Sequence, residues 1–113
     1  MPREMNLDDV RGFVKKAALR EGWELNGNEE FLGRILEGLL VNYRRYGYFQ
    51  CPCRDSWGDR TKDRDIVCPC LYCGPDIEEF GQCFCGLFLS GEMARSGRIP
   101  SSIPDRRPEE RYP

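Results

Sequence analysis

Three Cys-X-Cys units decide how this sequence is interpreted: CPC at residues 51–53, CPC at residues 68–70 and CFC at residues 83–85. The chain has seven cysteines, and Cys73 is the one that lies outside these units. No cysteine occurs before residue 51 or after residue 85. Cysteines gathered in one part of a chain indicate a single site, whereas a disulfide scaffold distributes them through the fold.

Sulfur must carry the chemistry of this site, because the chain contains no histidine. Histidine-dependent catalytic triads, Rieske-type ligation, cysteine–histidine zinc fingers and imidazole acid–base catalysis are therefore excluded. A proline between two cysteines fixes its own φ and pushes the residue before it towards an extended conformation, so the two sulfurs tend to diverge. Each CPC unit can thus present one sulfur to a cofactor and the other elsewhere.

The spacing of the cysteines favours an iron–sulfur centre over a zinc site. Structural zinc sites usually take their ligands from C-x2-4-C knuckles, and this spacing occurs only between Cys70 and Cys73. A [4Fe-4S] cube binds four thiolates at its corners over a wider volume, and it accepts ligands from scattered pairs. The cysteines then divide into four ligands, a dithiol and one remaining thiol. A zinc site and a set of buried or disulfide-bonded cysteines are the alternatives.

Two amphipathic helices are predicted before the cysteines. The first begins after Asn6, a residue type that caps helices, and its apolar residues recur at three- and four-residue spacing until Gly22. The second begins after Asn28 and ends at Gly47. A short helical turn is predicted for residues 75–80, with a proline in its first position. We expect these helices to form the scaffold of the site.

Composition favours one small soluble domain spanning residues 1–113. The 17 basic and 19 acidic side chains give a net charge of -2, which is a poor match to nucleic acid. No apolar run has the length of a membrane span or the pattern of a signal peptide, so we expect a cytoplasmic protein that does not enter membranes.

Two segments are predicted to lack long helices. Residues 54–67 are polar and charged, and we expect them to form a loop that crosses the surface between two cysteine units. Residues 91–113 are rich in proline and arginine and predict an extended segment, either lying on the domain or partly disordered. Ile99 and Ile103, each before a proline, are candidate anchors for it, and no catalytic residue is expected there.

From Cys51 to Ser90 the chain resembles the catalytic (beta) subunit of ferredoxin-thioredoxin reductase. That family has CPC, a spacer, CPC, a shorter spacer and then CHC followed by an apolar run, and here the third unit is followed by Gly86-Leu87-Phe88-Leu89. The resemblance implies a small, mainly α-helical domain organised around a [4Fe-4S] cluster. It also implies that ferredoxin binds one face and that thioredoxin or a thioredoxin-like protein binds the other, with a small second subunit as a further partner.

The resemblance also implies the role of each cysteine. The cluster ligands would be Cys51, Cys68, Cys70 and Cys83. The redox-active disulfide would join Cys53 to Cys85, and single electrons from ferredoxin would pass through the cluster to this disulfide and on to a target disulfide. Cys53 precedes a polar loop and is the expected nucleophile, whereas Cys85 precedes an apolar run and is expected beside the cluster.

The sequence departs from the family pattern in three ways. Phe84 replaces the histidine of CHC, so Tyr72, acidic side chains or water would have to take over its role in protonation. The spacer before Cys68 is shorter, and that before Cys83 longer, than in the plant-like form, which indicates a distinct branch. Cys73 has no counterpart, and we expect it to be a buried or surface thiol that is dispensable as a ligand.

Two other functions fit the same residues. The first is a zinc-stabilised binding module that uses residues 54–67 as its recognition surface. The second is a one-electron carrier similar to ferredoxin, which would hold a cluster but have no redox-active disulfide. Arg54 is interpreted either as an ordinary surface arginine or as a cation that favours the thiolate of Cys53.

Overall fold

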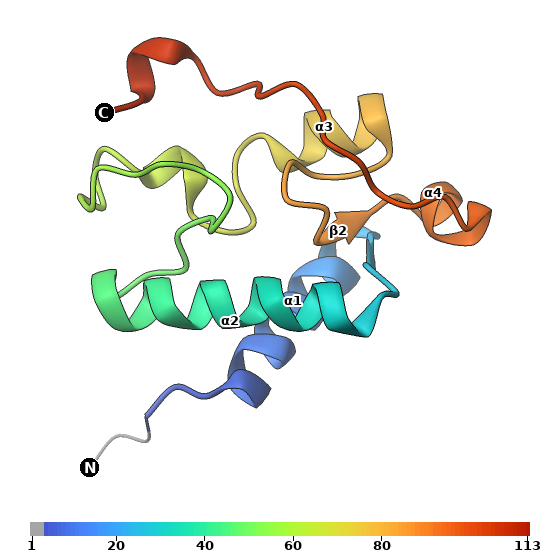
Figure 1. The fold of residues 1–113 in the computed structure, drawn as a ribbon, viewed down its shortest axis with the longest axis horizontal. Helices are drawn as coiled ribbons and strands as arrows, with labels where there is room; N and C mark the ends of the chain where they lie inside the picture. Colours follow the sequence, from blue (N-terminus) through green and yellow to red (C-terminus); the bar gives the residue numbers. More distant parts are fainter. Residues whose placement is uncertain (1–3) are drawn as a thin grey trace.

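Helices make up about half of the chain in the computed structural model, which describes residues 4–113 (Figure 1). The elements in chain order are α1 (Leu7–Glu21), β1 (Glu24–Leu25), α2 (Glu29–Tyr46), the 3-10 helix η1 (Arg64–Ile66), α3 (Cys73–Phe80), β2 (Phe88–Leu89), α4 (Gly91–Ser96) and the 3-10 helix η2 (Glu109–Arg111). The prediction of a small helical domain is therefore confirmed, although the share of helix is lower than "mainly α-helical" implies.

The two long helices begin and end where the sequence predicts. The Asn6 side chain accepts a hydrogen bond from the backbone of Asp9, whose carboxylate accepts one in return from Asn6, and this reciprocal pair starts α1. Asn28 starts α2 in the same position, by accepting from the backbone N–H of Phe31. Each helix ends at a glycine in the left-handed conformation, with φ 77° at Gly22 and 83° at Gly47.

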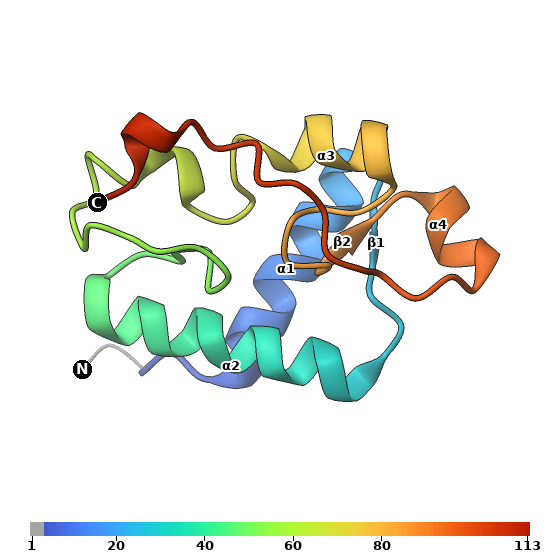
Figure 2. The ribbon, with the colours of Figure 1, turned by 45° about the horizontal axis from the view of Figure 1, so that its top comes forward.

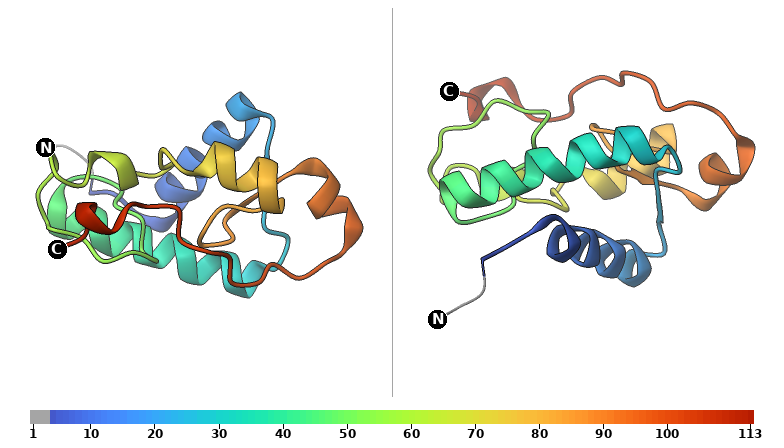
Figure 3. Two further views of the ribbon diagram at one scale, coloured as in Figure 1. Left: turned by 90° about the horizontal axis from the view of Figure 1, so that it is seen from above. Right: turned by 60° about the horizontal axis from the view of Figure 1, so that its bottom comes forward.

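The core lies between α1, α2 and the cysteine-bearing segments. α1 packs across α2 (Figure 3), and most of the regularly spaced apolar residues of the two helices are buried, although Phe31 of α2 is 39% exposed. The fully or nearly fully buried residues of this interface are Val10, Val14, Leu32, Leu36 and Leu39. Five of the cysteines belong to the same hydrophobic core, so the packing of the helices also positions these thiols.

A two-residue antiparallel pairing of β1 with β2 connects the helices to the last cysteine unit. Leu25 pairs with Phe88 and Glu24 with Leu89. Next to this pairing, Asn26 is buried and donates through its side chain to the carbonyl of Gly86 at 2.9 Å. The link between α1 and α2 thus fixes the backbone that follows the third cysteine unit.

Helix α3 begins at Cys73, two residues before the predicted start at Pro75. Proline is tolerated in the first turn of a helix, where its missing N–H has no partner to lose, so Cys73 and Gly74 can be helical ahead of it. The earlier start places the unmatched cysteine within a helix that borders the site.

Residues 54–67 follow the prediction of a loop only in part. They contain η1, and Val67 forms an isolated bridge with Gln50. Arg54, Asp63 and Asp65 are buried, contrary to a loop that merely crosses the surface. These charged residues fold inward because partners from other segments meet them there, and the sequence pattern contains no sign of those partners.

The C-terminal residues begin with a short helix, α4, that the sequence analysis missed. Ser90 caps it by accepting from the backbone N–H of Met93. Beyond α4 the chain runs in an extended path across the domain to η2, past α3 (Figure 2). Within residues 4–113 every helix is too short or too polar to cross a bilayer.

Candidate functional site

Six cysteines from the three units and α3 line one pocket, called here the thiol pocket. Its sulfur-bearing lining consists of Cys51, Cys68, Cys70, Cys73, Cys83 and Cys85. Leu39 of α2, together with Leu87 and Phe88, covers it with apolar surface. All of these cysteines are buried except Cys85, which is partly exposed. The structure thus brings the four predicted ligands together, and it places Cys73 with them.

Short backbone contacts hold the first two units side by side. The N–H of Cys51 donates to the carbonyl of Ile66 at 2.9 Å, and that of Cys68 donates to the carbonyl of Phe49 at 2.7 Å. These bonds flank the Gln50–Val67 bridge. Pro52 packs against Gly38 of α2, where an added Cβ would lie 2.8 Å from the Cβ of Pro52. The close approach of α2 to the first unit therefore requires a glycine.

A tight turn holds the third unit. The N–H of Gly86 donates to the carbonyl of Cys83 at 2.9 Å, and Gly86 has φ 74°, a conformation that favours glycine. The backbone N–H of Phe88 donates to the Sγ of Cys83 at 3.3 Å. The Sγ atoms of Cys83 and Cys85 lie 3.9 Å apart, so both sulfurs of this unit face the same region.

Cys73 contacts two of the predicted ligands. Its Sγ lies 3.5 Å from that of Cys70, and it also interacts with Cys83. Sequence reasoning placed it as a dispensable buried or surface thiol, and its burial is confirmed. The C-x2-C spacing from Cys70 to Cys73 was the available signal, because the turn of such a knuckle, closed here by a hydrogen bond from the N–H of Cys73 to the carbonyl of Cys70 at 3.1 Å, brings both sulfurs together.

Cys53 and Cys85 line a second pocket, called here the outer pocket. Its other lining residues are Phe31, Gln82, Phe84, Gly86, Pro100, Ser101 and Ser102. Cys53 is exposed there. Cys85 lines both pockets, so one side chain connects the buried thiols to the surface.

The environment gives these two thiols opposite acidities. Hydrogen bonds from Cys51 and Cys85, together with the nearby charge of Arg54, lower the pKa of Cys53 to about 4. Hydrogen bonds with Cys51, Cys53 and Cys83, followed by burial, raise the pKa of Cys85 well above its usual value. The two shifts have opposite directions, and they favour Cys53 over Cys85 as the more acidic thiol.

Arg54 is buried beside the thiol pocket, and its interpretation as a surface arginine is wrong. Its Nη1 donates to the Sγ of Cys70 at 3.3 Å, and its Nε lies 3.3 Å from the Oδ1 of Asp105. The charge next to Cys53 was visible in the sequence. Its burial was not, because Asp105 comes from a segment 51 residues away.

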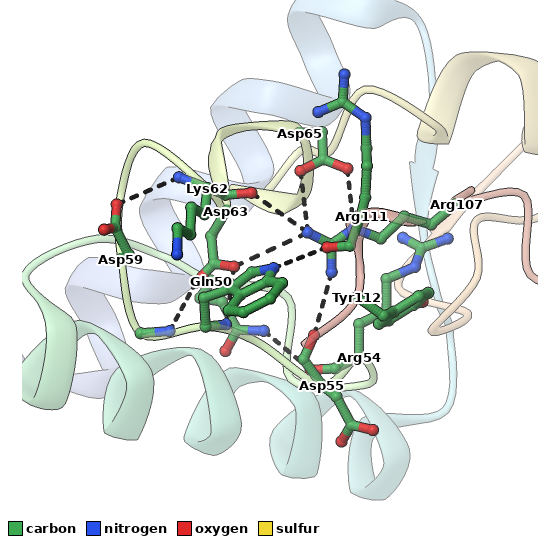
Figure 4. Close-up of polar contacts among 12 residues, drawn as sticks. Gln50, Arg54, Asp55, Asp59, Lys62, Asp63, Asp65, Arg107, Arg111 and Tyr112 are labelled. Atoms are coloured by element: carbon green, nitrogen blue, oxygen red, sulfur yellow. Dashed lines mark hydrogen bonds and ion pairs between the residues drawn. The ribbon is translucent and has the colours of Figure 1, made fainter. Parts of the chain in front are cut away.

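A buried ion-pair network, shown in Figure 4, ties the C-terminal segment to residues 54–67. Arg107 donates to both carboxylate oxygens of Asp65, at 2.9 and 3.2 Å, and lies 3.9 Å from Asp63. Tyr48 donates to Asp63 at 2.9 Å and Tyr72 donates to Asp65 at 2.7 Å. No catalytic residue was predicted in this segment, and its observed part is structural, because it holds Asp105 opposite Arg54.

The donor set of the thiol pocket fits an iron–sulfur cluster. The described residues contain no group of three or more cysteine or acidic side chains arranged to hold a single metal ion. A cubic cluster has a different requirement, because it binds four thiolates spread over its corners. The pocket offers thiols in an apolar lining, and Nη2 of Arg54 is buried there without a hydrogen-bond partner. Cysteine sulfur and a positively charged N–H donor both suit an anionic cluster of iron and sulfide.

Comparison with known proteins identifies one family. The family model described as ferredoxin thioredoxin reductase catalytic beta chain matches residues 1–105. A comparison with curated proteins gave no match. The matched range contains all seven cysteines, Arg54 and Asp105, whereas Arg107 lies beyond it.

Proposed function

Because this chain belongs to the ferredoxin thioredoxin reductase catalytic beta chain family, an iron–sulfur family of oxidoreductases, we propose that it reduces protein disulfides with single electrons from ferredoxin. The proposed acceptor is thioredoxin or a thioredoxin-like protein. The proposed cofactor is a [4Fe-4S] cluster held by Cys51, Cys68, Cys70 and Cys83. The observation that supports this most is the position of Cys85, which lines both the thiol pocket and the outer pocket that contains Cys53.

The cluster, when bound, would supply electrons one at a time beside a disulfide whose reduction to a dithiol needs two. The protein's own residues do the rest. Leu39, Leu87 and Phe88 keep water from the thiol pocket. Four of the buried thiols provide the ligands, and the exposed Cys53 remains free for a protein partner.

The dithiol transfers two electrons to the target by thiol–disulfide exchange. The Cys53 thiolate attacks one sulfur of the target disulfide, so that a mixed disulfide forms and the second target sulfur leaves as a thiolate. The Cys85 thiol gives its proton to that leaving thiolate and then attacks the sulfur of Cys53. A Cys53–Cys85 disulfide forms and the first target sulfur leaves, which completes the reduction of the target.

Cys85 is the proposed source of this proton because the chain has phenylalanine at the position of the family histidine. Tyr72, one of the candidates for this role, donates its hydroxyl to Asp65. Burial and this hydrogen bond raise the pKa of Tyr72 to about 12, which makes it a poor proton donor at neutral pH. Cys85 lines the outer pocket together with Cys53, so its thiol lies beside the place where the exchange occurs.

The outer pocket is the proposed docking point for the target disulfide. Phe31 on its edge is 39% exposed and offers an apolar contact. Paired hydrogen bonds between Gln82 and Ser101, at 2.8 and 2.9 Å, hold the C-terminal segment along its side. Ferredoxin and a small second subunit are proposed partners on the basis of family membership alone.

The test is anaerobic purification followed by iron and sulfide analysis and an assay with thioredoxin. We expect about four irons and four sulfides per chain, a brown protein, and reduction of the thioredoxin disulfide when reduced ferredoxin or a low-potential dye is added. A colourless zinc protein would replace the proposal with the binding module. A brown protein whose Cys53 and Cys85 cannot form a disulfide would replace it with the one-electron carrier.

A further inference from the structure

The guanidinium of Arg54 is enclosed by side chains from three separate parts of the chain. Its side chain has no exposed surface. Its central carbon lies 4.3 Å from the centre of the Phe84 ring and 5.2 Å from that of Tyr72. Both distances are within the range of cation–π contacts, which gain strength when water is excluded. Phe84, which stands where the family has histidine, therefore forms a cation–π contact with the buried guanidinium of Arg54.

The hydrogen-bond donors of Arg54 are only partly used by the protein. Nε faces Asp105 at 3.3 Å, and Nη1 donates to the Sγ of Cys70 at the same distance. Nη2 is buried and has no partner among the described residues. A buried cationic N–H group without an acceptor is costly, so its presence points to an acceptor that belongs to the site itself.

We propose that Arg54 raises the reduction potential of the cluster by placing a fixed positive charge and N–H donors beside the Cys70 thiolate. This inference rests on the proposed function, since it assumes that the thiol pocket holds the cluster. Reduction adds a negative charge to the cluster, and a nearby cation in a site of low polarity stabilises that extra charge. Hydrogen bonds to ligand sulfur act in the same direction. Arg54 is a positioning residue here, because it acts through the cluster and not on the target disulfide.

Asp105 has a defined part in this arrangement. Its carboxylate also accepts from the hydroxyl of Tyr112 and from the backbone N–H of Arg107 at 2.9 Å. The network around Arg107 therefore fixes the carboxylate that holds the guanidinium against Phe84. The C-terminal segment thus contributes to the electrostatics of the thiol pocket through Asp105, without lining the pocket.

The experiment measures the reduction potential of the iron–sulfur-loaded protein by anaerobic titration, followed by absorption and electron paramagnetic resonance. Arg54→Gln removes the charge, and Arg54→Lys keeps it on a different side chain. Arg64→Gln is the matched control, because Arg64 is exposed. We expect Arg54→Gln to lower the equilibrium constant for reduction at least tenfold, which is 59 mV for one electron. Arg54→Lys should recover most of this shift, and Arg64→Gln should cause none.

A wild-type potential in Arg54→Gln with full iron content would overturn the inference, as would an equal shift in Arg54→Gln and Arg54→Lys. If Arg54→Gln takes up no iron, the circular dichroism of that variant decides. A native spectrum of Arg54→Gln, together with iron bound in Arg54→Lys, supports the inference, because the charge at residue 54 then stabilises the bound cluster. An unfolded Arg54→Gln chain contradicts the inference. Absence of iron and sulfide from the wild-type protein would instead refute the proposed function, so the two failures are distinguishable.

Discussion

Replacement of Arg107 by alanine should destabilise the protein far more than a single arginine substitution usually does. The side chains of Arg107 and Asp63 have no exposed surface, and that of Asp65 is 2% exposed. Without the guanidinium, the buried carboxylates of Asp63 and Asp65 keep only hydrogen bonds from uncharged hydroxyl and backbone N–H groups. Removal of one partner from a buried ion pair costs about 3–5 kcal/mol of unfolding free energy.

Thermal unfolding of the anaerobic protein, followed by far-ultraviolet circular dichroism, measures this effect. At roughly 4 °C per kcal/mol for a chain of this size, the expected decrease in apparent Tm is roughly 12–20 °C. Arg111→Ala is the matched control, since Arg111 is exposed and its hydrogen bonds with Trp57, at 2.8 Å, and with Pro108, at 3.0 Å, are made by its backbone, which the substitution keeps. It should lower the apparent Tm by no more than about 2 °C, as expected for a surface substitution that changes the unfolding free energy by about 0.5 kcal/mol or less.

The pH dependence gives an independent check. Burial opposes ionisation of Asp65, but hydrogen bonds from Arg107 and Tyr72 outweigh it and lower the pKa of this carboxyl. A carboxyl with a lowered pKa in the folded state stabilises the protein above its unfolded pKa of about 3.9, and this contribution is lost as the pH falls through the folded value. The difference between wild type and Arg107→Ala should therefore shrink below about pH 4. Equal melting of Arg107→Ala and Arg111→Ala at pH 7 would refute the reasoning.

Three further predictions concern the cysteines. A serine at any one of the four proposed ligands should sharply lower the iron content measured per chain, and full iron content in two or more of these variants would contradict the ligand set. Cys73→Ala should keep its iron because four thiolates already complete the cube. Loss of iron from Cys73→Ala but not from Cys70→Ala would show that Cys73, and not Cys70, is the ligand. Serine at Cys53 or Cys85 should abolish disulfide reduction without loss of iron, and only Cys85→Ser should be trapped as a mixed disulfide with thioredoxin on a non-reducing gel. A trap formed by Cys53→Ser alone would reverse the two roles.

The scaffold was largely predictable because its signals are local. Asn6 and Asn28 cap the helices that follow them, and Gly22 and Gly47 end those helices. The start of α3 was misplaced by two residues because proline is compatible with several positions in a first turn. Helix α4 was missed because it has only six residues and a single buried apolar side chain, Met93, so no periodic pattern could form.

In the candidate site, too, the features with local signals were predictable and those that depend on distant residues were not. The crowding of cysteines between residues 51 and 85 was enough to predict that thiols would meet, and the thiol pocket confirms this. The burial of Arg54 and Arg107 could not be predicted, because each is enclosed by side chains that lie far away in the sequence. Asp105 is 51 residues from Arg54, and Asp65 is 42 residues from Arg107. Charge patterns describe neighbours along the chain and contain no information about such pairings.

The contact between Gly38 and Pro52 sets a limit on how far this protein can be stabilised by improving α2. Glycine inside a helix costs about 0.5–1 kcal/mol relative to alanine, so Gly38 and Gly33 would both be obvious positions for a helix-strengthening substitution. Gly33 has no atom within 4 Å of an added Cβ and could accept one. At Gly38 the same methyl group would meet a rigid proline ring at 2.8 Å and push the first CPC unit away from the helix. At residue 38, an alanine would strengthen the helix but displace Cys51 and Cys53. The glycine found there weakens the helix and keeps these two cysteines in place.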